Sequence, residues 1–351
     1  MSNHKQVESL TITKTDELLE TIDSVFKQDV RDYINSIRFS TSPRTRYEYL
    51  LNIRQFLTYL KDSGFKADST ADLSKLTVRD FNNYLVYIEH YKIDDIEHRN
   101  SIPSIRRKIT ALKRFFDYLY KTDAISTIEI HKVEMPKQPK KKPIVYMTHT
   151  ESTDFLNNVK TGSQLSDRAK VFHDKLCCRD LAIMYLFLST GIRISELVEL
   201  DITDIDIDET SVLVTRKGGN QEIVYFSDTA ASYIKDYLDE RQNNEKIPDT
   251  EKALFLSQQN KRISIRAVQQ LVKKYASTSV PLKHVTPHKL RSTFGTNLYQ
   301  ETGDIYAVAE ALGHNDVNTT KKHYAHISED IKRSHRNLVS YESEGEENDT
   351  D

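Results

Sequence analysis

The sequence predicts a two-domain, mainly α-helical protein: an all-α N-terminal domain, then an α+β domain with a small antiparallel β-sheet. With 351 residues the chain is too long for one ordinary domain. Helical spacing of apolar residues runs through most of it, but the proline- and lysine-rich stretch Met135 to Lys142 has no apolar period. We therefore place the first domain at residues 1–134, a basic linker at 135–147 and the second domain at 148–340.

The first domain is expected to contain helices alone. Ser42 and Pro43 supply an N-cap and a first-turn proline for a helix that Gly64 ends. Thr77 and Asp80 resemble a capping box at the start of the next helix, which runs to about residue 88. Apolar residues at intervals of three and four predict further helices over residues 16–37 and 104–119.

The second domain alternates helical patterns with one glycine turn between two short apolar stretches. The turn, Lys217-Gly218-Gly219-Asn220, separates strands expected near residues 205–214 and 223–226. The acidic segment 341–351 is expected to be disordered. Helices are expected at residues 150–159, 166–188, 195–200, 228–241, 264–276, 287–300, 305–312 and 318–323.

Composition indicates a soluble cytoplasmic protein. Hydrophobic residues make up 38% of the chain and charged residues 29%, which is typical of a globular protein. No apolar run approaches the roughly 20 residues that cross a bilayer, so no membrane partner is expected. The N-terminus lacks the apolar core of a signal peptide, and the two cysteines, Cys177 and Cys178, are adjacent, which favours a reducing compartment.

The distribution of charge is compatible with a nucleic-acid partner although the net charge is −2. The last eleven residues carry six acidic side chains and no basic one, so residues 1–340 have 50 basic and 46 acidic residues, a formal charge of +4. Local positive patches, not a positive total, bind phosphates. Solvated surface would explain the same runs equally well. The residues expected to contact DNA are Arg106, Arg107, Lys113, Arg114, Lys140, Lys141 and Lys142.

Chemically versatile side chains of the second domain lie in recognisable local contexts. Arg193 follows the helix stop Gly191 and precedes Glu196 by three residues, so that the carboxylate can fix the arginine fork. His288 and Arg291 share one face of a helix that begins at Pro287. Taken alone, each of these short patterns is more often structural than catalytic.

Three further residues complete a set that suits phosphoryl transfer. Lys217 lies at the hairpin tip and could protonate a departing 5′ oxygen, and His314 follows a glycine-closed helix end ten residues before Tyr324. A phenol has a pKa near 10, so roughly one tyrosine in a thousand is ionised at pH 7. Nearby guanidinium groups favour the phenolate, and His288 or His314 could accept its proton. An aryl phosphodiester conserves bond energy, so a cut strand can be resealed without ATP.

The second domain resembles the tyrosine recombinase (phage integrase) family in the string from Thr190 to Leu200, in H-K-L-R, in L-G-H and in the following tyrosine. The helical first domain with its basic linker resembles the family's core-binding domain. The resemblance implies a catalytic domain with Tyr324 as nucleophile and Glu196 in support of the first arginine. It assigns catalysis to Arg193, Lys217, His288, Arg291 and His314.

The same resemblance implies a reaction on double-stranded DNA with paired recombination sites. A homotetramer would form a 3′-phosphotyrosine intermediate and a Holliday junction, with neither a metal nor another cofactor. Residues 327–339 would dock into a neighbouring subunit, and accessory recombination proteins are further candidate partners. The short N-terminal region favours a Xer-like enzyme or a simple mobile-element integrase. One departure from the family pattern is Ser292, where a histidine is common.

Three other interpretations remain open at this point. A type IB topoisomerase would use the same chemistry without pairing sites, and a non-cutting DNA-binding relative would keep the fold alone. A zinc hydrolase could use His314, His323 and His326 near the two cysteines, but the chain has neither H-E-x-x-H nor paired C-x-x-C spacing. Site-specific recombination accounts for all the motifs together.

Overall fold

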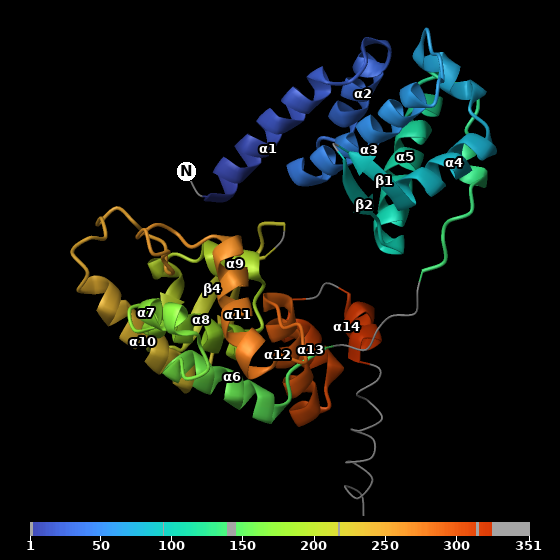
Figure 1. The fold of residues 1–351 in the computed structure, drawn as a ribbon. Coiled ribbons are helices and arrows are strands. Elements are labelled where there is room, and N and C mark those ends of the chain that lie inside the picture. Colours follow the sequence, from blue (N-terminus) through green and yellow to red (C-terminus); the bar gives the residue numbers. More distant parts are fainter. Residues whose placement is uncertain (1–2, 94, 139–144, 217, 314–315, 325–351) are drawn as a thin grey trace, which may run out of the picture. The chain divides into compact units, whose positions relative to one another are not determined.

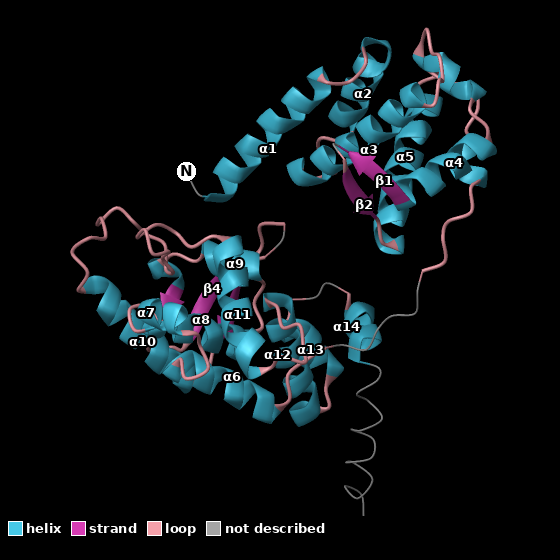
Figure 2. Cartoon of the chain, viewed as in Figure 1, coloured by secondary structure: helices cyan, strands magenta, loops and turns pink. Residues whose placement is uncertain are grey.

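The computed structural model describes residues 3–93, 95–138, 145–216, 218–313 and 316–324. The chain divides into two compact units, Met1–Lys141 and Lys142–Asp351. Each unit has its own apolar core. The ribbon in Figure 1 and the colouring of Figure 2 show that helices dominate both units and that the strands form small sheets. The mainly helical class predicted from the sequence is therefore confirmed, with one exception in the first unit.

The first unit is a bundle in which α3 packs against both α1 and α5. Ser42 caps α3 by accepting a hydrogen bond from the Thr45 amide, and Pro43 begins the helix. The apolar stripe of α5 is buried, as its spacing predicts. The helices are α1 (Asn3–Glu20), α2 (Ser24–Ser36), α3 (Pro43–Asp62), α4 (Val78–Glu89) and α5 (Ile102–Lys121), with short 3₁₀ helices η1 (Thr70–Lys75) and η2 (Glu129–Lys132).

The single helix predicted over residues 16–37 is wrong. The chain breaks after Glu20, and α2 starts at Ser24 behind the N-cap Asp23, whose side chain accepts from the Val25 amide. Capping satisfies an amide that the helix itself leaves unpaired, so an aspartate at this position favours a new helix start.

The first unit is not all-α, because β1 (His90–Ile93) and β2 (Ile96–Arg99) form an antiparallel hairpin. Asp95, in the turn, has a φ of +61°, a conformation that aspartate tolerates better than most residues. Tyr91 on β1 stacks on His98 with ring centroids 5.2 Å apart. Cross-strand pairs of this kind stabilise a hairpin that helical periodicity does not reveal.

The second unit is built around α8, which packs against α6, α10 and α12. Most residues of α8 are buried, which agrees with its nearly continuous apolar sequence. The helices are α6 (His149–Thr161), α7 (Asp167–His173), α8 (Cys177–Thr190), α9 (Ile194–Glu199), α10 (Asp228–Gln242), α11 (Ile265–Ser279), α12 (Pro287–Thr302), α13 (Ile305–Ala311) and α14 (Val317–Tyr324), with a 3₁₀ helix η3 (Ile202–Asp204).

The helix predicted over residues 166–188 is in fact two helices, α7 and α8. His173, the last residue of α7, is buried, and its Nδ1 lies 3.1 Å from the Tyr275 hydroxyl of α11. This tertiary contact competes with helix continuation and places a bend where the local sequence shows no breaker.

The sheet of the second unit has the antiparallel order β3 (Ile205–Asp206), β4 (Ser211–Thr215), β5 (Gln221–Tyr225). Val212, Val214 and Val224 are buried, whereas Ile223 and Tyr225 are exposed, so the sheet has one inner and one outer face. Arg216, which follows β4, brings this sheet into contact with the candidate site through Glu196. Within the described ranges no helix combines the length and apolar character needed to cross a membrane.

Candidate active site

Gly191 shapes the turn from which the site is built. It ends α8 with a φ of +61°, and a Cβ at this position would lie 2.3 Å from Cδ1 of Phe294 and 3.0 Å from Cδ2 of Leu312. Both the backbone conformation and the lack of space require glycine. The turn leads the chain into α9, where Arg193 is the N-cap residue.

Glu196 fixes the guanidinium of Arg193. One carboxylate oxygen, Oε2, accepts from the Arg193 amide at 2.7 Å, and the other, Oε1, accepts from Arg193 Nη1 at 2.7 Å. Glu196 is buried, whereas the Arg193 side chain is 34% exposed. A partly exposed guanidinium that a buried carboxylate holds in place is preorganised to bind an anion from solvent.

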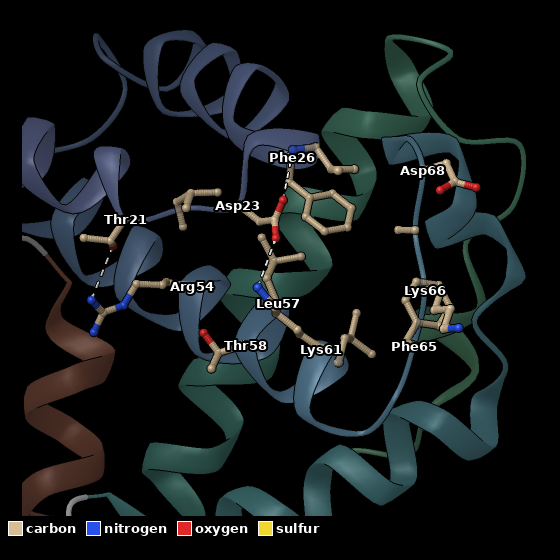
Figure 3. A pocket seen from close by; sticks show the side chains of 14 residues that line it. Thr21, Asp23, Phe26, Arg54, Leu57, Thr58, Lys61, Phe65, Lys66 and Asp68 are labelled. Atoms are coloured by element: carbon tan, nitrogen blue, oxygen red, sulfur yellow. Dashed lines mark hydrogen bonds and ion pairs between the residues drawn. The ribbon is translucent and has the colours of Figure 1, made fainter.

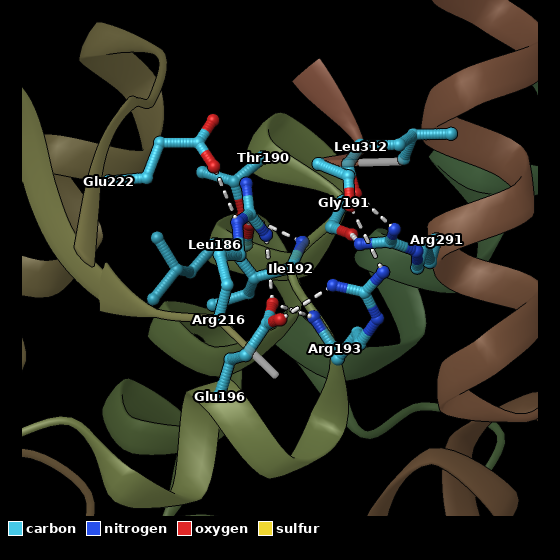
Figure 4. Close-up of polar contacts among 11 residues, drawn as sticks. Leu186, Thr190, Gly191, Ile192, Arg193, Glu196, Arg216, Glu222, Arg291 and Leu312 are labelled. Carbon is cyan, nitrogen blue, oxygen red and sulfur yellow. Dashed lines mark hydrogen bonds and ion pairs between the residues drawn. The ribbon is translucent and has the colours of Figure 1, made fainter. Parts of the chain in front are cut away.

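Arg291 approaches the same turns from α12. Its Nη1 donates to the Gly191 carbonyl at 2.6 Å and its Nη2 donates to the Leu312 carbonyl. Arg193 Nη2 donates to the next carbonyl, that of Gly313, at 3.3 Å. Figure 4 shows the two arginines converging on the ends of α8 and α13. The structure thus brings together two of the arginines that the sequence singles out.

A third arginine, Arg216, belongs to the site although it is not among the residues that the sequence predicts; it directly precedes Lys217. It is buried, with Nη1 2.9 Å from Glu196 Oε2 and Nε 2.8 Å from Glu222 Oε2. Alternation along β4 was a usable signal, because Val212 and Val214 point inward and a period of two places Arg216 on the same face. A buried arginine requires an acidic partner, so a glutamate is expected to lie close to it.

The shared charges shift the pKa values of this cluster. Burial tends to raise the pKa of Glu196, but hydrogen bonds from the Arg193 amide and guanidinium, together with the Arg216 charge, lower it overall. Burial opposes the charge on Arg216, yet Glu222 and Glu196 outweigh burial and raise its pKa. Glu196 and Arg216 are therefore both charged at neutral pH.

The remaining predicted catalytic residues are described only in part. His288 is exposed in the first turn of α12, and its carbonyl accepts from the Ser292 hydroxyl at 3.0 Å. Tyr324 is the last residue of α14, a helix that packs against α13. The side chain of Tyr324 is not among those that the structure describes. Lys217 and His314 lie outside the described residues, as do residues 327–339.

The predicted DNA contacts in the first unit differ in environment. Arg107 and Arg114 are exposed on α5, and the Arg114 guanidinium lies 5.7 Å from the Tyr49 ring centroid of α3. Arg106 is half-buried and donates to the Pro136 carbonyl at 2.7 Å, so it also holds the end of this unit. Lys113 is half-buried, and Lys140, Lys141 and Lys142 lie outside the described residues.

The first unit also contains a pocket of about 530 Å³ beside the α1–α2 turn and α3 (Figure 3). Lys61 pairs with Asp23 at 3.5 Å, and Arg54 Nη1 lies 3.5 Å from the Thr21 hydroxyl. This lining lacks the converging guanidinium groups of the second unit. Among the described side chains, no group of three histidine, cysteine, aspartate or glutamate residues is arranged to hold a metal.

Sequence comparison relates the chain to recombinases. Residues 146–330 match the phage integrase family. Tyrosine recombinase XerS of Streptococcus agalactiae serotype III (strain NEM316) is 32% identical, with 93% of this chain and 98% of XerS aligned. Tyrosine recombinase XerC of Caldanaerobacter subterraneus subsp. tengcongensis is also 32% identical, over 90% of this chain and 87% of XerC.

Solved structures share the fold at lower identity. XerH site-specific recombinase, bound to palindromic difH substrate in a post-cleavage complex, has a TM-score of 0.69 and 19% identity over 94% of this chain and 89% of XerH. The Tn1549 transposon integrase, in complex with a circular intermediate DNA, has a TM-score of 0.63 and 18% identity, with 89% and 99% coverage. The family match and the full-length relatives show that this chain belongs to the phage integrase family and is a site-specific tyrosine recombinase of the Xer type.

Proposed function

We propose that Arg193 and Arg291 hold the scissile phosphate while Tyr324 attacks it. The Tyr324 oxygen forms a bond to phosphorus as the bond to the 5′ oxygen breaks, which yields a 3′-phosphotyrosine and a free 5′ hydroxyl. Lys217 gives a proton to the departing oxygen. His288 and His314 receive the tyrosine proton or stabilise charge on the phosphate.

The placement of Arg193 and Arg291 carries this proposal. Arg193 stands at the start of α9 and donates to the Gly313 carbonyl, whereas Arg291 comes from α12 and donates to the Gly191 and Leu312 carbonyls. Preorganised cations stabilise charge that develops on a transferring phosphoryl group without reorganising during the reaction. Bidentate arginine geometry suits a phosphate better than lysine does.

Rejoining reverses this step, because the 5′ hydroxyl of the partner strand attacks the phosphotyrosine, restores a phosphodiester and releases Tyr324. Two rounds of cleavage and rejoining exchange strands between paired sites in double-stranded DNA. We assign the first cleavage and exchange to the formation of a Holliday junction and the second to its resolution, on a homotetramer in the cytoplasm. XerH bound to difH and the Tn1549 integrase bound to circular intermediate DNA support DNA as the partner. Exposed Arg107 and Arg114 would contact phosphates, and accessory recombination proteins would set the direction of exchange.

Covalent trapping tests the proposal. Purified protein is incubated with nicked duplex fragments of its own genome, so that the short product strand is lost and religation fails. After denaturation, the expected result is a protein–DNA adduct that wild-type protein forms and Tyr324→Phe does not. Sequencing the trapped DNA identifies the site, and recurrence of that site at the ends of a mobile element would distinguish an element-borne integrase from a chromosomal Xer-type enzyme.

Other outcomes would overturn the proposal. Specific, salt-sensitive binding without an adduct would indicate a non-cutting relative. Relaxation of plasmids that lack the recovered site, at a rate proportional to protein concentration, would indicate a topoisomerase, because recombination requires several protomers on two sites.

A further inference from the structure

A series of ion pairs with alternating charge begins at Arg193 and passes through the buried side chains of Glu196 and Arg216. Glu196 accepts from Arg193 through Oε1 at 2.7 Å and from Arg216 through Oε2 at 2.9 Å. Arg216 in turn donates from Nε to Glu222 at 2.8 Å. Arg193 is partly exposed, Glu196 and Arg216 are buried, and Glu222 is partly exposed again. Figure 4 shows the Glu196 carboxylate joined to both Arg193 and Arg216, and Arg216 joined in turn to Glu222.

Arg216 also joins segments that are distant in the sequence. Its backbone amide donates to the Asn220 carbonyl at 2.7 Å, which closes the β4–β5 turn. Its side chain lies against Gly313, where a Cβ would be 2.8 Å from Nε and 2.9 Å from Cζ. The Gly313 carbonyl is the acceptor for Arg193 Nη2. The backbone of the glycine thus contacts one arginine while its missing side chain makes room for another.

The geometry points to Arg216 as a positioning residue for DNA cleavage, which holds Glu196 so that Glu196 can hold Arg193 against the scissile phosphate. This inference rests on the proposed role of Arg193. Without Arg216, Glu196 Oε2 keeps the Arg193 amide as its sole hydrogen-bond partner among the described residues, and the buried carboxylate can rotate away from the guanidinium. Arg216 would not itself touch DNA, because its side chain is buried behind Glu196.

Pairing alone does not explain why an arginine is used here. One guanidinium reaches two carboxylates through two different nitrogens, which a lysine ammonium on a flexible stem does not reproduce with the same rigidity. A third nitrogen, Nη2, is buried and has no hydrogen-bond partner among the described residues, at 3.2 Å from the Cβ position of Gly313. Replacing such an arginine with a neutral side chain of similar length would be tolerated if packing were its sole role.

The test uses the DNA site recovered by covalent trapping, synthesised as a nicked substrate in three forms. One has the ordinary phosphodiester. A second has a methylphosphonate at the scissile position, which removes the negative charge that Arg193 neutralises. The third has sulfur in place of the bridging 5′ oxygen, so that the leaving group needs no proton from Lys217. Wild-type cleavage of the ordinary substrate and its loss in Tyr324→Phe establish the proposed function independently.

We expect Arg216→Met to slow single-turnover cleavage of the ordinary substrate by roughly 30- to 100-fold, the scale of a lost positioning interaction. The defect should shrink to less than about 5-fold on the methylphosphonate and persist on the sulfur substrate, the pattern also expected for Arg193→Ala. Arg216→Lys should recover part of the rate on the ordinary substrate.

The matched control is Arg262→Met. Arg262 pairs with Asp201 and donates to the Val198 carbonyl at 3.0 Å, so it braces the other end of α9 without contacting Glu196. This variant should lose thermal stability yet cleave at close to the wild-type rate once folded. Three results would overturn the inference: a wild-type rate for Arg216→Met, full rescue by the sulfur substrate, or an equal defect on all three substrates.

Discussion

Arg193 and Arg291 donate to consecutive carbonyl oxygens, those of Gly313 and Leu312, although they belong to different helices. The peptide groups at the end of α13 therefore set the separation of the two guanidinium groups. Because α14, which ends at Tyr324, is the next helix and packs against α13, α13 also links the arginine pair to the segment that bears the proposed nucleophile.

Removing either Arg193 or Arg291 should affect the rate of DNA cleavage much more than DNA affinity. Arg193→Ala and Arg291→Ala should retain DNA affinity within a few-fold, because many phosphates are contacted, while cleavage falls at least ~100-fold. Gel-shift titration and single-turnover cleavage on the trapped site measure the two effects. Wild-type-like cleavage by either variant would remove that arginine from the catalytic set.

The Arg291 variant should also be less stable than the Arg193 variant. Arg291 is buried and holds two carbonyls, so its loss leaves buried acceptors unpaired, at about 1–3 kcal/mol for each such group. The free energy of unfolding from urea titration provides the comparison, and equal stability of the two variants would contradict this account of Arg291.

Gly191→Ala should damage the site through packing. A Cβ there would lie 2.3 Å from the Phe294 ring, in addition to the strain of a φ of +61°. Gly64→Ala is the matched control, since Gly64 has a φ of +82° but no atom within 4 Å of the added carbon. We expect a cost of about 1–2 kcal/mol for Gly64→Ala from the left-handed conformation alone, and about 2–5 kcal/mol for Gly191→Ala, where overpacking adds to it.

Thermal or urea unfolding of each alanine variant, compared with the wild type, measures these two costs. If both alanine variants lose the same stability, the close contact between Gly191 and Phe294 is relieved cheaply and does not fix the turn before Arg193.

Acidification should weaken the ion pair between Glu196 and Arg193, because it protonates the Glu196 carboxylate. The pKa of Glu196 is held below its ordinary value of 4.5 in spite of burial, by Arg193 and Arg216, while Glu222 lies on the far side of Arg216. A lowered folded-state pKa contributes stability that is fully present above about pH 4.5 and is lost as the pH falls through the folded value.

Urea midpoints measured from pH 7 to pH 3 test this linkage. Glu196→Gln should be less stable than wild type at pH 7, and the gap should narrow below pH 4.5, the ordinary value of the lost carboxyl group. A gap that stays constant with pH would show that protonation of Glu196 does not contribute to acid sensitivity.

The first unit should bind phosphates through the exposed face of α5. Arg107→Ala and Arg114→Ala should each weaken binding at low salt and reduce the slope of log K against log salt by about 1. Arg79→Ala, the same charge change at an exposed position on α4, serves as the control and should leave the slope unchanged. Equal effects at all three positions would indicate a general charge effect in place of a contact surface.

Local signals were sufficient where the structure depends on neighbours in sequence. Pro43 with its cap Ser42, the buried stripe of α5 and the helix stop at Gly191 could all be predicted, because caps, periodicity and glycine conformations act over a few residues. The spacing of Arg193 and Glu196 likewise placed the carboxylate within reach of the guanidinium.

Features that depend on distant contacts were missed. The break between α7 and α8 accompanies the burial of His173 against Tyr275, and the β1–β2 hairpin depends on cross-strand pairing around Asp95. Arg216 was overlooked for a different reason. Its inward position follows from strand alternation, but the importance of that position appears only when Glu196 from α9 is brought to it.

The most direct test of the central claim is to identify the residue that carries DNA in the trapped adduct. After nuclease and trypsin digestion, mass spectrometry should find a nucleotide on the peptide that begins at His323 and contains Tyr324, linked through the 3′ phosphate. A nucleotide on Tyr306 or Tyr341, or a linkage to the 5′ phosphate, would contradict the assignment of Tyr324 as the nucleophile in a 3′-phosphotyrosine mechanism.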